Sequence, residues 1–179
     1  MKKPIIHSSE IVHKNPWYQI RHDILTWPNN KPGHYFVTEF PDTVGIICIH
    51  EEKILTVNQY RHTIEKETIE LPMGSLHPNE QPLEAAQREL REETGHQAAH
   101  WELLGSFFNL TGACRNLTHV FIASDLTACA TAHDDSEDGM TSEWRDLADW
   151  RRLIRDGNIT HGETLAAWTL WRERANSVS

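Results

Sequence analysis

Near the N-terminus, apolar and polar residues alternate in short runs, and longer apolar runs follow. Residues 17–25 and 34–40 show the every-second-residue spacing of half-buried strands, and residues 28–33 between them are rich in Pro, Asn and Gly. We therefore expect a β-hairpin. Residues 43–49 form a continuous apolar run typical of a central buried strand. Residues 53–60 read as a second strand, reached through an acidic turn.

The pattern changes to a helical period over residues 82–94. Leu83, Ala86 and Leu90 are spaced at i, i+3 and i+7, which predicts one buried stripe on an amphipathic helix. Gly95 follows directly and favours helix termination.

The remaining chain continues the alternation of strands and helices. We expect strands over residues 100–108 and 117–123, a polar loop over residues 128–142, and two helices that begin near Asp146 and Thr160.

The polar side of the 82–94 helix carries the first candidate chemistry. Glu89, Glu92 and Glu93 fall at i, i+3 and i+4, so they share one face. Like charges at this spacing repel each other unless cations lie among them. Carboxylate oxygens are hard ligands, so the face suits Mg²⁺, with Mn²⁺ as a possibility, better than zinc. The alternative is a solvated acidic helix face without a ligand.

Composition narrows the class of protein. The chain has 179 residues, 39% of them hydrophobic, which suits one compact domain with room for a small extra element. The net charge of -9 argues against a nucleic-acid partner, and an anionic substrate would need metal ions and local arginines. No apolar segment is long enough for a signal peptide or a membrane span. We therefore expect no membrane partner. The three cysteines lack the spacing of a disulfide framework, which indicates free thiols in a reducing compartment, so we expect a cytoplasmic protein; they are Cys48, Cys114 and Cys129.

The stretch from residue 74 to residue 95 resembles the Nudix box, the signature of the Nudix hydrolases. All of its fixed letters stand at the right spacing, and only the last apolar position departs, because it is His96; the matching residues are Gly74, Glu80, Arg88, Glu89, Leu90, Glu92, Glu93 and Gly95. The resemblance implies an α/β/α sandwich with a mixed β-sheet and an N-terminal β-hairpin extension. Residues 1–40 would be that extension, with a dimerisation role, and residues 41–179 the hydrolase domain.

The resemblance also implies roles within the box. Glu93, Glu89 and Glu92 would bind the metal and be catalytic, in that order of preference. The backbone carbonyl of Met73 would be a further metal ligand. The other box positions would be structural: Arg88 would pair with one of the helix carboxylates and Glu80 would brace the loop, beside Gly74 and Gly95.

Two further segments resemble the ADP-ribose pyrophosphatase branch of this family. They are Gln59-Tyr60-Arg61 and Glu70-Leu71-Pro72-Met73-Gly74. Arg61 could fork onto a diphosphate, and Glu70 could accept from a ribose or base donor. An alternative for Arg61 is a surface ion pair with Glu65 or Glu67.

The loop after residue 108 gives a weaker signal. Arg115 is a candidate phosphate contact, with a solvated arginine as the alternative. The branch usually carries a proline where Thr111 stands, and this departure puts ADP-ribose specificity in doubt. For the acid that positions or deprotonates the attacking water, the resemblance points to Glu137, then Asp138 and Glu143; the alternative is an acidic loop without chemistry.

The reaction implied is metal-dependent hydrolysis of a nucleoside diphosphate linked to a second moiety. ADP-ribose or a related nucleotide sugar would give a nucleoside monophosphate and a sugar phosphate. Other Nudix substrates stay open: a GDP-sugar, a dinucleoside polyphosphate or an oxidised nucleotide. So do a non-catalytic nucleotide-sugar sensor and a regulatory protein–protein module. We expect a small-molecule nucleotide partner and a homodimer.

Overall fold

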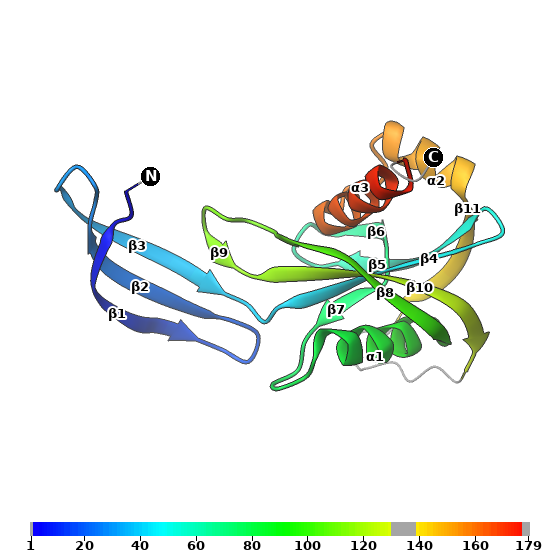
Figure 1. The fold of residues 1–179 in the computed structure, drawn as a ribbon, viewed down its shortest axis with the longest axis horizontal. Coiled ribbons are helices and arrows are strands. Elements are labelled where there is room, and N and C mark those ends of the chain that lie inside the picture. Colours follow the sequence, from blue (N-terminus) through cyan, green and yellow to red (C-terminus); the bar gives the residue numbers. More distant parts are fainter. Residues whose placement is uncertain (1, 130–138, 177–179) are drawn as a thin grey trace. The chain divides into compact units, whose positions relative to one another are not determined.

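The computed structural model describes residues 2–129 and 139–176 and contains two compact units (Figure 1). Unit 1 is built from residues within 1–42 and 108–117. Unit 2 is built from residues within 43–107 and 118–179.

Unit 1 is a four-stranded sheet in the order β1-β2-β3-β9. The predicted hairpin is confirmed, because β2 (Gln19–Thr26) and β3 (Pro32–Glu39) pair antiparallel around the expected turn. Two strands of this sheet were not predicted: β1 (Ile5–Lys14), which pairs with β2, and β9 (Cys114–Arg115), which adds parallel to β3. Every residue of β1 is exposed, so no buried face imposes the alternation that marks a strand.

Unit 2 holds a mixed sheet in the order β11-β5-β4-β10-β8. The parallel pair is β4 with β10, and β4 and β5 form an antiparallel hairpin. Its tight turn places two acidic residues at positive φ, Glu51 at 46° and Glu52 at 60°. The strand bounds are β4 (Thr43–His50), β5 (Lys53–Arg61), β8 (His96–Phe108), β10 (Leu117–Ala128) and β11 (Thr141–Asp146), with β6 (Lys66–Glu70) beside β5 and β7 (Met73–Ser75) beside β4.

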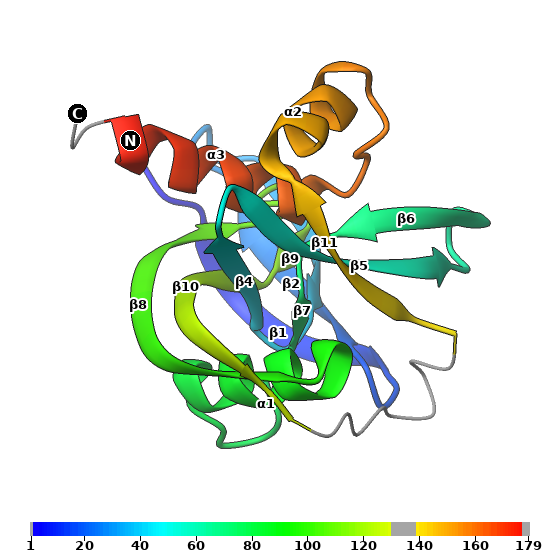
Figure 2. The same cartoon turned by 90° about the vertical axis from the view of Figure 1, so that its right-hand side faces the viewer.

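Helices cover both faces of this sheet (Figure 2). Helix α1 (Pro82–Thr94) packs on one face, against a core that includes Ile46 and Cys48 of β4. Helices α2 (Leu147–Arg155) and α3 (Gly162–Asn176) pack on the other face, where Ile47 joins their core. Successive side chains of β4 thus enter opposite cores, as expected for a central strand. The expected α/β/α sandwich with a mixed sheet is confirmed.

Some local expectations were wrong. Leu83 is 40% exposed, and Ala85 is buried on the helix face in its place. The expected loop over residues 128–142 ends earlier, because Thr141 and Ser142 already pair with β5. In the part of the chain that is described, no helix has the length and apolar character needed to cross a membrane.

Candidate active site on helix α1

Helix α1 begins and ends at the predicted residues because both ends carry strong local signals. Pro82 occupies the first turn, and the Glu84 side chain accepts a hydrogen bond from the backbone nitrogen of Gln81 at 3.0 Å. Gly95 closes the helix in the left-handed conformation, with φ 65° and ψ 31°, and its N–H donates to the Arg91 carbonyl at 3.0 Å. The helix therefore holds its glutamate face in a defined place.

Glu89 is buried against the backbone of β7. Its side chain lies so close to Gly74 that a Cβ atom at residue 74 would stand 1.9 Å from the Glu89 carboxyl carbon. Only glycine leaves room for this carboxylate. The glycine that opens the box motif is thus explained by close approach, since its side-chain space is filled by Glu89.

Arg88 hydrogen-bonds to the carboxylates of Glu80, Glu89 and Glu92. Its Nη1 donates to Glu89 Oε1 at 2.7 Å and to Glu92 Oε2 at 3.0 Å. Its Nε donates to Glu80 Oε1 at 2.9 Å, and these hydrogen bonds raise the pKa of Arg88 despite partial burial. These hydrogen bonds are the pairing that the sequence predicted for Arg88, and its supporting role in the site stays a prediction.

Glu80 fastens the loop that precedes α1. Besides Arg88, it accepts a hydrogen bond from the backbone nitrogen of His77 at 2.8 Å. The hydrogen bonds from Arg88 lower the pKa of Glu80 to about 2, against its partial burial. Glu80 thus contacts both the loop and Arg88, which supports the predicted bracing role.

Glu93 connects α1 to the first residue of β7. It is 3% exposed, and its Oε2 accepts a hydrogen bond from the Met73 backbone nitrogen at 2.9 Å. The backbone of Met73 therefore lies beside Glu93, and the predicted role of its carbonyl as a metal ligand stays a prediction.

Among the described residues, no three acidic, histidine or cysteine side chains form a ready-made metal cage. Glu89 and Glu92 are turned toward Arg88, and Glu93 toward the Met73 nitrogen. The donor set still fits a hard divalent cation: it consists of carboxylate oxygens on one helix face, and the space beside Gly74 holds the buried Glu89 carboxylate.

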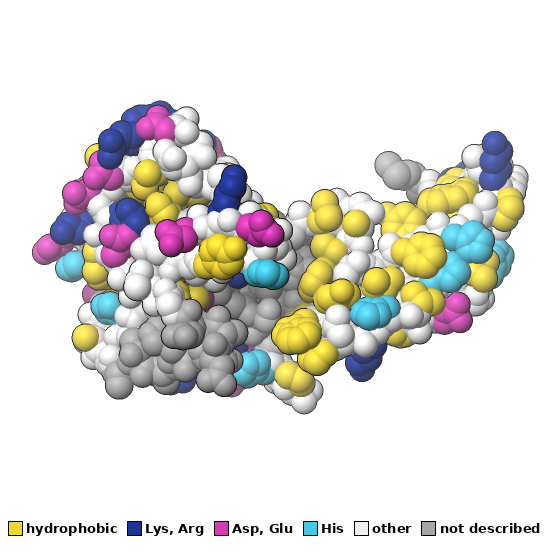
Figure 3. Space-filling model, turned by 180° about the vertical axis from the view of Figure 1, so that it is seen from behind, with side chains coloured by type: hydrophobic (Ala, Val, Ile, Leu, Met, Phe, Trp, Pro, Cys, Tyr) yellow, Lys and Arg dark blue, Asp and Glu magenta, His cyan; other side chains and the backbone are white. Residues whose placement is uncertain are grey.

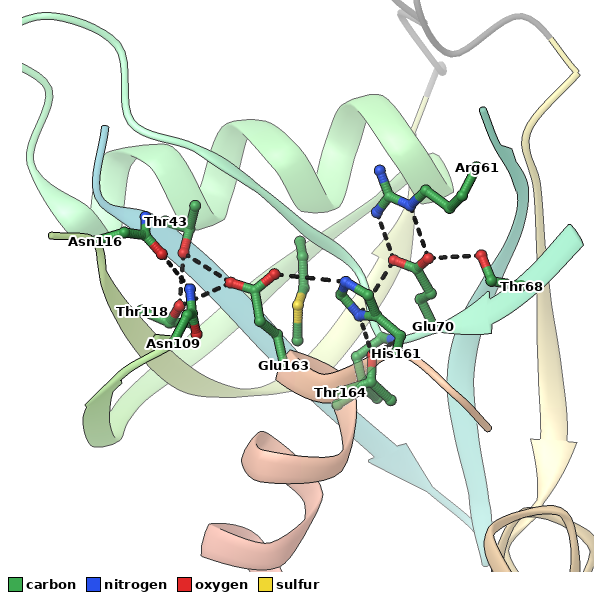
Figure 4. A network of polar contacts seen from close by, with 12 residues as sticks. Thr43, Arg61, Thr68, Glu70, Asn109, Asn116, Thr118, His161, Glu163 and Thr164 are labelled. Atoms are coloured by element: carbon green, nitrogen blue, oxygen red, sulfur yellow. Dashed lines mark hydrogen bonds and ion pairs between the residues drawn. The ribbon is translucent and has the colours of Figure 1, made fainter. Parts of the chain in front are cut away.

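Arg61 and Glu70 form a bidentate pair at the ends of β5 and β6 (Figure 4). Arg61 donates through Nε to Glu70 Oε1 at 2.8 Å and through Nη2 to Glu70 Oε2 at 2.5 Å. Arg61 therefore pairs with Glu70 rather than with Glu65 or Glu67. This hydrogen bonding raises the pKa of Arg61, and the negative charge of Glu93 adds to the effect.

Glu70 itself is fully buried, and Thr68 donates a further hydrogen bond to its Oε1 at 2.6 Å. Burial alone would raise the pKa of Glu70, but the Arg61 hydrogen bond, with the nearby His161 and Thr68, brings that pKa below its ordinary value. Glu70 is therefore an ionised carboxylate whose two oxygens both accept from protein donors.

The other candidates lie in different places. Arg115 is an exposed residue of β9 in unit 1. Glu143 lies on β11, where it accepts from Asn58 at 2.9 Å and pairs with Arg145. Glu137 and Asp138 fall outside the described residues.

Sequence reasoning missed one group that the structure brings to Glu70. His161 was interpreted only as part of the start of the last helix and Thr164 was not singled out, yet His161 contacts Glu70 and Thr164 contacts Leu71 beside it. The only sequence signal of His161 is the Thr-His-Gly-Glu segment at the start of α3, which does not reveal a partner some ninety residues away.

Comparison with known proteins decides the family. The family model for the NUDIX domain matches residues 39–168. The chain belongs to the Nudix family. Nudix hydrolases generally need divalent metal ions, in keeping with the carboxylate face of α1.

Individual relatives point in the same direction. An ADP-ribose pyrophosphatase of Bacillus subtilis (strain 168) is 32% identical over 142 residues, which are 78% of this chain and 77% of the relative. An ADP-ribose pyrophosphatase of Mycobacterium tuberculosis (strain ATCC 25618 / H37Rv) is 32% identical over 163 residues, 89% of this chain and 78% of the relative. The expected enzyme class, a Nudix pyrophosphohydrolase, is confirmed.

The fold agrees with a solved structure. The crystal structure of an ADP compounds hydrolase superposes with a TM-score of 0.88 at 22% sequence identity, over 100% of this chain and 97% of that chain. The expected Nudix fold is thereby confirmed.

Proposed function

We propose that this Nudix protein hydrolyses the diphosphate bond of a nucleotide sugar, with ADP-ribose as the first candidate. Water adds to one phosphorus and the bridging P–O bond breaks, so ADP-ribose gives AMP and ribose 5-phosphate. The observation that carries the proposal is the glutamate face of α1, where Glu89 and Glu93 are buried against residues 73–74.

The metal would be Mg²⁺, with Mn²⁺ as the alternative. Glu89, Glu92 and Glu93 would hold it, together with the carbonyl of Met73. When bound, such an ion neutralises charge on a diphosphate and acts as a Lewis acid. Arg88 would keep two of these carboxylates in place through its hydrogen bonds.

Binding of the diphosphate falls to Arg61. Its side chain is 38% exposed although its partner Glu70 is fully buried, so the guanidinium reaches the solvent. Its hydrogen bonds to Glu70 use Nε and Nη2, which leaves the Nη1 edge to face a phosphate. Arg115 stays a candidate for a second phosphate contact.

A loop carboxylate would orient the attacking water. Glu137 remains our first candidate, followed by Asp138 and Glu143. Glu143 already accepts hydrogen bonds from Asn58 and Arg145, which supports a structural role for it.

ADP-ribose is preferred over other nucleotides for two reasons. The segment Gln59-Tyr60-Arg61 resembles that branch, and the two relatives described above are named ADP-ribose pyrophosphatases. Thr111 in place of the usual proline is the reason to test a panel of substrates rather than one.

The test is turnover of ADP-ribose, GDP-mannose, UDP-glucose, a dinucleoside polyphosphate and NADH, with Mg²⁺, with Mn²⁺ and with chelator. Glu93→Gln keeps an acceptor for the Met73 nitrogen but removes the charge. We expect it to lower turnover on the order of 10²–10⁴-fold. The matched control is Glu84→Gln on the same helix, where the exposed amide still caps Gln81.

The outcomes separate the alternatives. Metal-dependent release of a nucleoside monophosphate that Glu93→Gln abolishes supports the proposal and names the substrate. Near-normal turnover by Glu93→Gln would overturn the assignment of the site. Tight binding of a nucleotide sugar without turnover by the unmodified protein would favour the sensor.

We also propose that the protein is a cytoplasmic homodimer whose unit 1 carries the interface. The cysteines are free, which agrees with a reducing compartment. Unit 1 exposes many large apolar side chains, some of them beside histidines on its surface (Figure 3). Among them are Ile5, Ile6, Ile11, Val12, Trp17, Ile24, Phe36 and Phe40.

A further inference from the structure

A second polar cluster lies at the start of α3, with the His161 ring at its centre (Figure 4). Nδ1 of the ring is 3.3 Å from Glu70 Oε2, and Nε2 is 3.5 Å from Glu163 Oε2. The ring therefore lies between a carboxylate at the end of β6 and a carboxylate in the first turn of α3.

The Nδ1 side of the ring is tied to the backbone next to Glu70. The Thr164 hydroxyl lies 3.0 Å from His161 Nδ1 and accepts a hydrogen bond from the Leu71 nitrogen at 3.0 Å. Thr164 is fully buried, so water does not compete for these bonds. Since Leu71 directly follows Glu70, His161 just before α3 contacts the side chain at this point and Thr164 in the first turn of α3 binds the adjacent backbone.

The Nε2 side of the ring is anchored to the sheet. Glu163 Oε1 accepts hydrogen bonds from the hydroxyls of Thr118 at 3.0 Å and Thr43 at 3.4 Å. These two threonines lie at the starts of β10 and β4, and their hydroxyls are 2.7 Å apart. The two sides of the ring thus have different partners, which experiments can separate.

We propose that His161 is a positioning residue that acts through Glu70 to hold the guanidinium of Arg61 in place for the substrate's diphosphate. The inference rests on the proposed function, in which Arg61 binds that diphosphate. A free arginine side chain loses rotamer entropy when it binds, whereas one already held by a fixed carboxylate loses less. The contribution of His161 should therefore appear in substrate binding.

Two amide substitutions test which side of the ring matters. In His161→Asn the amide nitrogen can occupy the place of Nδ1, and in His161→Gln that of Nε2. We expect His161→Asn to keep KM near that of the unmodified protein, and His161→Gln and His161→Ala to raise KM about tenfold, with kcat changed less than about threefold. Equal KM values in all three variants, or equal rises with Asn and Gln, would overturn the proposal.

A double-mutant cycle tests whether the effect passes through Arg61. If it does, His161→Ala should raise KM no further in an Arg61→Lys background, because lysine cannot form the bidentate pair. Additive increases in KM would instead mean that His161 contributes to the fold in general, and would overturn the positioning role.

A third measurement needs no substrate. The Arg61 Nε–H, which donates to Glu70, should exchange slowly with solvent in the ¹⁵N–¹H spectrum of the unmodified protein and of His161→Asn. It should exchange faster in His161→Gln and His161→Ala. Equal protection in all four proteins would overturn the proposal. Silence of the unmodified protein across the substrate panel would remove the proposed function, while this measurement still decides whether His161 positions Arg61.

Discussion

At the scale of a single residue, Gly74 has no side chain, and the Glu89 carboxylate fills the space that a Cβ atom would occupy. Because a Cβ at residue 74 would overlap that carboxylate, Gly74→Ala must displace the Glu89 side chain or β7. We expect the Glu89 carboxylate to move rather than the strand, because the end of a side chain is displaced more easily than backbone. Turnover should then fall on the order of 10²-fold or more, because a proposed metal ligand is lost. Turnover assays and thermal unfolding, measured on the same samples, check this.

The matched control for Gly74→Ala is Gly105→Ala on β8. A Cβ there would meet only Leu170 at 3.7 Å, which is an ordinary contact. It should change neither turnover nor stability appreciably. If Gly74→Ala keeps turnover within about threefold of the unmodified protein, Glu89 is not a required ligand in the site.

At the scale of elements, Glu80 and Arg88 join the loop before α1 to the helix itself. The hydrogen bonds from Arg88 bring the pKa of Glu80 down to about 2, from an ordinary value of 4.5. A lowered pKa in the folded state stabilises the protein above the unfolded pKa, and this contribution is lost as the pH falls through the folded pKa. We therefore expect Glu80→Gln to lower the free energy of unfolding on the order of 2–3 kcal/mol at pH 7.

The difference between Glu80→Gln and the unmodified protein should shrink between about pH 5 and pH 2, as measured by denaturant unfolding over a pH series. Glu102→Gln is the control, because it breaks the exposed ion pair with Arg174 and should cost less than about 1 kcal/mol. A difference for Glu80→Gln that does not vary with pH would contradict an ionic origin of the stability.

The elements also show which parts of the fold a sequence can reveal. The bounds of helix α1 were predicted because the helical spacing of apolar residues and the terminal Gly95 act locally, although Leu83 of the expected stripe is exposed. Strands β1 and β11 were missed because most of their residues are exposed, so burial imposes no alternation on them. The site divides in the same way: glutamate spacing on α1 is local, whereas the contact of His161 with Glu70 depends on the folded chain.

At the scale of the whole molecule, unit 1 presents β1 as an uncovered sheet edge. All ten residues of β1 are exposed, including Ile5, Ile6 and Ile11. Natural proteins protect such long apolar edge strands with charged residues or cover them with other structure. We infer that a second copy of the chain covers β1. We expect sedimentation equilibrium to give twice the chain mass of 20.7 kDa.

Single charges should weaken this dimer if unit 1 forms its interface. Ile11→Lys and Phe36→Lys each place an ammonium group at an exposed apolar position, 47% and 57% exposed in the single chain. If these positions are buried in the dimer, the introduced charge must be desolvated. We therefore expect the dissociation constant of the dimer to rise by about 30-fold or more. Leu103→Lys on β8 of unit 2, where the leucine is 53% exposed, should leave the dimer intact. A dimer that Leu103→Lys disrupts and Ile11→Lys spares would place the interface on unit 2, and a monomer at all concentrations would remove the dimer itself.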